Sequence, residues 1–143
     1  MIGGREESDE VLRAAEQVGA LIARRDAVLV CGGLGGVMEA ACRGARKSGG
    51  TTVGILTMGD AAPANAYVDI VIPTDMGVAR NAIIINSCAG VIAVGGSFGT
   101  LSEMAFALQR GIPIVSLHSW QVDPSVMVAE SAEEAVGMLF ERL

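Results

Sequence analysis

The chain has 143 residues, a size that suits one domain around a single core. Its net charge of −6 disfavours a nucleic-acid partner, since such binding usually depends on a basic face. Its apolar runs are too short for the roughly 20 residues of a membrane span and the N-terminus lacks the apolar segment of a signal peptide, so we expect a cytoplasmic protein without membrane contact.

The first half of the chain alternates apolar strands with amphipathic helices. A strand ends at residues 2–4, and Ser8 is placed to cap a helix that runs to about Arg25. The elements expected after it are a strand over 27–31, a helix over 37–47, a strand over 51–56 and a long loop over 57–66.

The second half repeats this alternation. The expected elements are a strand over 67–72, a helix over 77–87, a strand over 91–94, a helix over 100–110, a strand over 112–117 and a short edge strand over 126–128. A last helix follows, for which Ser131 and Glu134 have the spacing of a capping box.

Short, nearly all-apolar strands that alternate with helices are typical of a parallel sheet covered on both faces. We therefore predict an α/β fold, a modified Rossmann fold that forms a single domain over residues 1–143. Its doubly wound, mostly parallel sheet should have about six to seven strands with helices on both faces. In such sheets ligands bind beyond the carboxyl ends of the strands.

Two glycine-rich loops are predicted at those ends, one after the strand over 27–31 and one after the strand over 91–94. Glycines let the backbone turn sharply and approach a ligand, and the start of the following helix attracts an anion. We therefore expect a small phosphorylated ligand, such as a nucleoside 5′-monophosphate. The residues predicted to contact it are Gly32, Gly33, Gly35, Gly36, Gly95, Gly96, Ser97, Phe98, Gly99 and Thr100.

The two common nucleotide-binding signatures do not match these loops. In a Rossmann fingerprint Met38 would stand in place of the third glycine, and no acid ends the strand over 51–56. Neither loop carries the G-K-[ST] ending of a P-loop.

Rare residue types exclude further chemistry. His118 is the only histidine, which excludes a multi-histidine metal site. Lys47, the only lysine, lies at the polar end of a helix, whereas a Schiff-base enzyme needs a desolvated lysine. The three cysteines, Cys31, Cys42 and Cys88, are interpreted as small buried residues. We therefore predict neither a bound metal nor a resident cofactor.

The run over residues 96–103, with Arg80 upstream, resembles the P-G-G-x-G-T-x-x-E signature of the LOG family. Its members are cytokinin-riboside-monophosphate phosphoribohydrolases, once misnamed lysine decarboxylases. The runs over 30–40 and 77–81 are most similar to a short-chain branch of this superfamily. That branch includes molybdenum-cofactor carrier proteins and is distantly related to DprA.

The resemblance implies roles for Arg80 and for residues of the loop and helix that follow the strand over 91–94. Gly96, Gly99 and Thr100 would bind the phosphate, and Arg80 and Glu103 would act at the N-glycosidic bond.

Neighbouring positions complete the predicted site and include departures from the enzymes. Asn81, which follows Arg80, is assigned to the ligand as well, although the enzymes have lysine after that arginine. Gly95 replaces the proline of the signature, and Ser97 replaces its second glycine and adds a hydroxyl donor.

Three functions stay open at this stage. One is hydrolysis of a nucleoside 5′-monophosphate to free base and ribose 5-phosphate. Another is binding without turnover of a nucleotide or of the pterin of the molybdenum cofactor. A DNA-handling role, suggested by the relation to DprA, is disfavoured by the acidic charge. Thr100 and Glu103 also have the spacing of a capping box, which would make Glu103 a structural residue.

We also expect a homodimer, because two helices carry apolar residues on more than one face and a partner subunit would bury part of them. The resemblance to the family implies the same. The residues concerned are Ile83, Ile84, Ile85, Met104 and Phe106.

Overall fold

The computed structural model describes all residues from Met1 to Leu143. Its strands are β1 (Ile2–Gly3), β2 (Leu29–Cys31), β3 (Thr52–Leu56), β4 (Ile70–Pro73), β5 (Val91–Val94), β6 (Ile114–Leu117) and β7 (Met127–Ala129). Its helices are α1 (Asp9–Ala23), α2 (Val37–Lys47), the 3₁₀ helix η1 (Gly77–Arg80), α3 (Asn81–Asn86), α4 (Phe98–Gln109) and α5 (Ala132–Phe140). No helix has the length and apolar character needed to cross a membrane.

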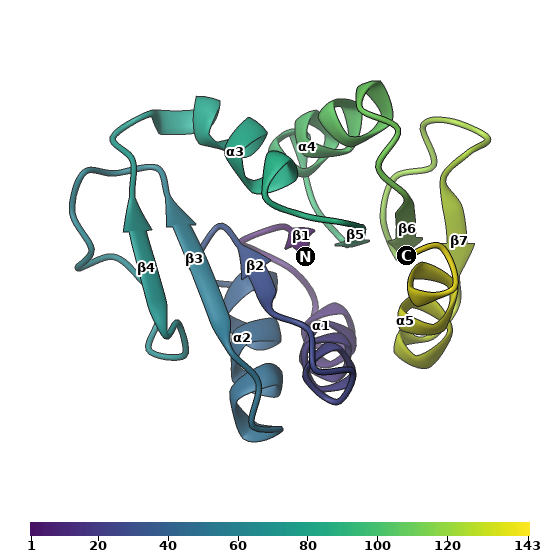
Figure 1. The fold of residues 1–143 in the computed structure, drawn as a ribbon, viewed down its shortest axis with the longest axis horizontal. Helices are drawn as coiled ribbons and strands as arrows, with labels where there is room; N and C mark the ends of the chain where they lie inside the picture. Colours follow the sequence, from purple (N-terminus) through teal and green to yellow (C-terminus); the bar gives the residue numbers. More distant parts are fainter.

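All strand pairs are parallel. The pairs form a four-stranded ladder, β1-β5-β6-β7, and a three-stranded ladder, β2-β3-β4. The two ladders lie side by side, with β1 next to β2 (Figure 1), and the amino group of Met1 donates to the carbonyl of Val30 at 3.0 Å. The seven strands confirm the predicted doubly wound α/β fold.

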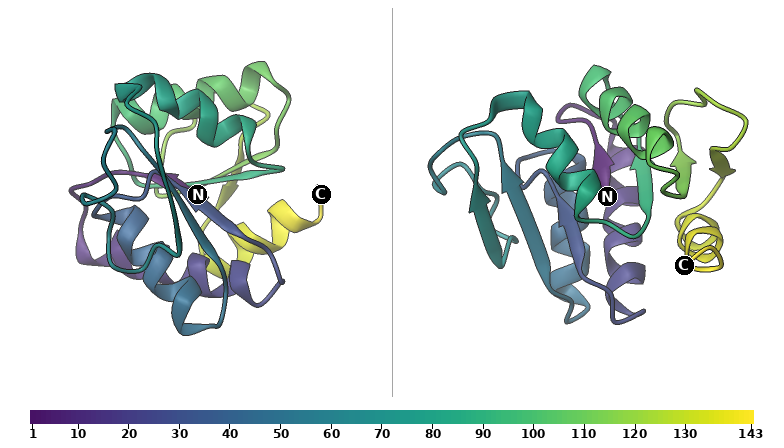
Figure 2. Two further views of the ribbon diagram at one scale, coloured as in Figure 1. Left: turned by 60° about the vertical axis from the view of Figure 1, so that its left-hand side comes forward. Right: turned by 45° about the horizontal axis from the view of Figure 1, so that its top comes forward.

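Helices cover both faces of the strands (Figures 1 and 2). Helices α1, α2 and α5 cover one face, and α3 and α4 cover the other. The interior is divided accordingly into a cluster of 24 buried residues on the first side and one of 10 on the second. Helices α1 and α2 approach backbone to backbone, since a Cβ at Gly19 or Gly44 would collide with a carbonyl of the opposite helix.

Helix α4 differs from its prediction. It begins at Phe98 rather than at Thr100, because Gly95 and Gly96 both take positive φ angles and complete the turn at once. Ser97 is the N-cap residue, so Thr100 lies within the first turn. The capping box predicted for Thr100 and Glu103 is therefore wrong.

The other predicted elements are largely confirmed. The expected helix over 77–87 is divided into η1 and α3, and β4 begins at Ile70 rather than at residue 67. At the start of α5, Ser131 accepts a hydrogen bond from the backbone N–H of Glu134 at 3.1 Å. The Glu134 carboxylate accepts from the backbone N–H of Glu130 at 2.8 Å instead of closing the box on Ser131.

The sheet covers most of the apolar residues that suggested a partner subunit. Ile84, Ile85 and Met104 are fully buried in the single chain, whereas Phe106 is 38% exposed. The homodimer stays a prediction.

Candidate functional site

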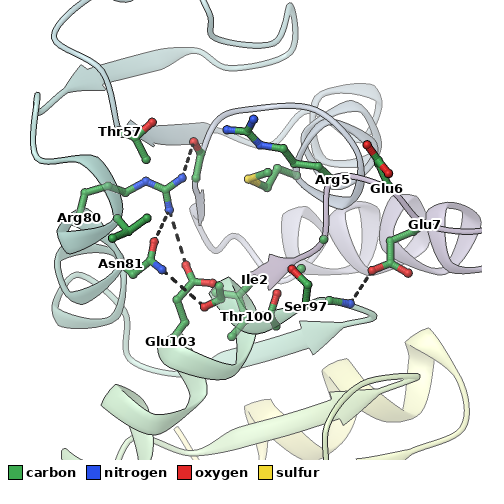
Figure 3. Close-up of a pocket in the computed structure, with 17 residues that line it drawn as sticks. Ile2, Arg5, Glu6, Glu7, Thr57, Arg80, Asn81, Ser97, Thr100 and Glu103 are labelled. Atoms are coloured by element: carbon green, nitrogen blue, oxygen red, sulfur yellow. Dashed lines mark hydrogen bonds and ion pairs between the residues drawn. The ribbon is translucent and has the colours of Figure 1, made fainter.

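Three loops meet at one edge of the sheet, where the central strands β1, β2 and β5 end. The loops that follow these strands line a crevice of about 620 Å³ (Figure 3). After β1 the chain forms β2, β3 and β4 on one side of this strand, and it then crosses over to form β5, β6 and β7 on the other side. The crevice therefore lies at the topological switch point, where open α/β sheets bind ligands.

Glycines allow the loops to come this close. Gly36, with φ of 68°, lies against the backbone carbonyls of Gly4 and Arg5, and a Cβ there would collide with them. The carbonyl of Gly4 also accepts from the backbone N–H of Val37 at 3.0 Å, at the first residue of α2. Gly32 faces the Arg80 guanidinium with no room for a side chain. The glycine loop after β2 therefore contacts both the loop after β1 and Arg80.

Arg80 and Glu103 form a buried pair in this crevice (Figure 3). Arg80 ends η1 and Glu103 lies in the second turn of α4, and both are 6% exposed. The Arg80 Nη1 lies 3.7 Å from Oε1 of Glu103 and donates to Oδ1 of Asn81 at 2.9 Å. The Arg80 Nη2 donates to the carbonyl of Gly32 at 3.4 Å.

The Nε of Arg80 is buried and has no hydrogen-bond partner. Buried donors are nearly always paired in folded proteins, so an unpaired guanidinium nitrogen in a crevice suggests that a ligand supplies the acceptor.

Burial dominates the electrostatics of this pair. It raises the pKa of Glu103 to about 7, although the charge of Arg80 acts in the opposite direction. Burial also lowers the pKa of Arg80, against the attraction of Glu103. A carboxyl group with a pKa near neutral can take up or release a proton under physiological conditions.

The loop between β5 and α4 is shaped for an anion. Gly95 and Gly96 have φ angles of 54° and 109°, and α4 follows with no side-chain cap on its free N–H groups. Glu7, from the loop after β1, already fills part of this place. Its Oε1 accepts from the backbone N–H of Gly96 at 2.5 Å.

The structure brings most of the predicted residues together. Those that line the crevice are Gly32, Arg80, Asn81, Gly96, Ser97, Gly99, Thr100 and Glu103. Asn81 is held by its side-chain amide, which donates to Oγ of Ser102 at 3.0 Å.

Five predicted contacts lie outside the lining: Gly33, Gly35, Gly36, Gly95 and Phe98. Four of these are loop glycines whose role in the structure is to shape the walls. Phe98 is 81% exposed and stacks on Trp120, with the ring centroids 6.4 Å apart. Their contact with a ligand stays a prediction.

The whole loop after β1 was missed. The unpredicted lining residues from this segment are Ile2, Gly3, Gly4, Arg5, Glu6 and Glu7, and Met38, Thr57 and Val78 complete the wall. Gly4 directly follows β1, just as a glycine directly follows β2 and β5 in the other two loops. That signal was present, but only the order of the strands shows that β1 lies in the centre.

The fold and the crevice together define a Rossmann-like protein with a candidate small-ligand site at its switch point. More particularly, the chain belongs to the SLOG cluster4 family, whose model matches residues 1–141. It is 47% identical to an uncharacterized protein of Archaeoglobus fulgidus over 136 residues, which are 95% of this chain and 89% of the relative.

Two solved structures are similar along nearly the whole chain. The molybdenum cofactor binding protein of Rippkaea orientalis is 36% identical, with a TM-score of 0.93 over 99% of this chain and 93% of its own. The molybdenum cofactor carrier protein of Chlamydomonas reinhardtii is 32% identical, with a TM-score of 0.89 over 99% of this chain and 94% of its own.

DprA of Streptococcus pneumoniae shares the fold alone. It is 21% identical, with a TM-score of 0.75 over 95% of this chain and 59% of its own.

Proposed function

We propose that the protein binds the molybdenum cofactor, a phosphorylated pterin, in the crevice and releases it unchanged. The observation that carries this proposal is the likeness to the Rippkaea and Chlamydomonas proteins over 99% of the chain. This likeness favours binding without turnover over hydrolysis of a nucleotide.

The residues of the crevice suit such a ligand. Its volume of about 620 Å³ lies within the range of roughly 300–1,000 Å³ that is usual for small-molecule sites. The unpaired Nε of Arg80 offers a charged donor, and the backbone N–H groups from Ser97 to Thr100, at the start of α4, offer further donors to a phosphate. A polar wall from Asn81 and Thr57 remains for the heterocycle.

Hydrolysis of a nucleoside 5′-monophosphate is the second candidate. The comparisons give it no support, but one observation favours it. Glu103 has a pKa of about 7 beside an arginine, which suits general acid–base catalysis. Under this alternative, AMP incubated with the protein releases adenine, and Glu103→Gln abolishes the release.

The decisive experiment measures what the protein retains. We expect protein purified from a host that makes the cofactor to carry a pterin, detected by mass spectrometry after extraction, and AMP to remain intact. Arg80→Lys keeps the positive charge but removes Nε, so the retained pterin should fall at least tenfold. The matched control is Arg110→Met, because Arg110 is an exposed residue at the far end of α4.

Purified protein that carries no pterin and binds none when it is supplied would refute the proposal. Release of adenine from AMP would replace it with the hydrolase.

A further inference from the structure

The Glu7 carboxylate occupies the place that the glycine loop of β5 prepares for an anion. Its Oε1 accepts from the Gly96 N–H at 2.5 Å, across 89 positions of the chain, and Figure 3 shows this bond at the edge of the crevice. A Cβ at Gly95 would also collide with the same carboxyl group. The Glu7 carboxyl group therefore lies directly against this glycine loop.

The loop attracts negative charge whichever group supplies it. Gly95 and Gly96 have successive positive φ angles, the Gly96 N–H already binds a carboxylate, and the 12-residue helix α4 adds its positive end. Arg80, which lines the same crevice and is 6% exposed, leaves its Nε without a hydrogen-bond partner, and this is an independent sign that a ligand belongs there.

Glu7 can leave without disturbing the fold. It is partly exposed, and both neighbours, Glu6 and Ser8, are exposed. The backbone on either side is held by other bonds, because the Gly4 carbonyl accepts from α2 and Ser8 caps α1. A rotation of the Glu7 side chain is enough to free the Gly96 N–H.

We propose that Glu7 is an internal competitor of the ligand's anionic group. An incoming phosphate must displace the carboxylate before it reaches the Gly96 N–H, so the affinity for any small anion is lowered by a constant factor. Free inorganic phosphate, which has few other contacts to offer, is thereby kept out. A larger phosphorylated ligand compensates through its remaining contacts in the crevice. This inference rests on the proposed function only in taking the ligand to be anionic.

The test uses inorganic phosphate as the probe, in titrations at constant ionic strength. Trp120 is the only tryptophan and stacks on Phe98, the first residue of α4, so its fluorescence reports on the loop. We expect Glu7→Ala to tighten phosphate binding by roughly tenfold to hundredfold, because a hydrogen bond to a charged group contributes about that factor. Glu7→Gln, which keeps the side-chain shape, should give a smaller gain.

The control for net charge is Glu10→Ala. Glu10 is exposed on the first turn of α1 and does not line the crevice, so this variant should bind phosphate within about twofold of the parent. In NMR spectra the Gly96 amide proton should shift in Glu7→Ala and return toward its original position when phosphate is added.

If Glu7→Ala and Glu7→Gln bind phosphate as weakly as the unmodified protein, or more weakly, the inference is wrong. Glu7 would then serve only to hold the loop in place. If phosphate binds to none of the variants, the inference is also wrong, because the loop would not bind an anion even after the Glu7 carboxylate has been removed. Pterin retention by the unmodified protein is measured separately. A protein that retains pterin while Glu7→Ala gains no phosphate affinity would refute the competitor alone.

Discussion

Replacing Glu103 by glutamine should change how the stability of the protein depends on pH. The pKa of Glu103 is about 7 in the folded protein, against an ordinary value of 4.5. The folded state therefore binds a proton more readily than the unfolded state between these two pH values. Stability from this group is fully present below about pH 4.5 and is lost as the pH rises through about 7.

The size of the effect follows from the difference of about 2.5 between the two pKa values. At about 1.36 kcal/mol for each pKa unit, this difference corresponds to about 3 kcal/mol of stability. Glu103 is 6% exposed, so solvent screens the effect little. Glu103→Gln removes the titration, and its free energy of unfolding relative to the parent should rise by about 3 kcal/mol between pH 4.5 and pH 8.

Urea unfolding of both proteins across this pH range measures the difference directly. The change with pH is the test, because any difference in stability between glutamine and the protonated form of Glu103 does not depend on pH. Glu141→Gln, at an exposed position after α5, is the control and should show no such change. A difference between Glu103→Gln and its parent that stays flat from pH 4.5 to pH 8 would refute the electrostatic description of the site.

Three further predictions concern single positions. Gly96→Ala should destabilise the protein by about 1–3 kcal/mol in urea unfolding, because φ is 109° and the new Cβ would meet Thr100. Gly99→Ala in the same loop has open space and should change stability by less than about 1 kcal/mol; equal losses in the two variants would contradict this. Gly137→Ala, in the middle of α5 with no atom in the way, should stabilise by about 0.5–1 kcal/mol, and a lower melting temperature would count against it. Hydrogen bonds from Arg43 and Lys47 lower the pKa of Glu16 to about 2, so its contribution is present above about pH 4.5 and lost as the pH falls through about 2. Glu16→Gln should therefore lose about 1 kcal/mol at pH 7 and much less at pH 2 in thermal unfolding, and an equal loss at both values would disprove the ion pair's role.

Local patterns in the sequence determined most of the secondary structure. Strands such as β5 and β6 are short apolar runs, and α1 follows a helical repeat behind the cap at Ser8. Such patterns depend on neighbours within a few residues, so they can be found without knowing the fold. The same holds for the glycine loops after β2 and β5, since a loop between strand and helix has a local signature.

The start of α4 shows where local patterns mislead. Thr100 and Glu103 have capping-box spacing, yet Ser97 is the cap and Glu103 faces Arg80. Two positive φ angles at Gly95 and Gly96 shorten the turn. A sequence pattern does not report such angles, because glycine is compatible with many conformations.

Patterns in the sequence were sufficient to predict the fold class, the two glycine loops and the residue types available for an anion. The folded chain adds that the loop after β1 joins these loops and that Glu7 meets Gly96 across 89 positions. It also shows that Arg80 is buried against Glu103 with one nitrogen unpaired. These contacts depend on the order of strands in the sheet, in which β1 lies between β2 and β5. Strand order is set by packing of the whole chain, and no short stretch of sequence contains it.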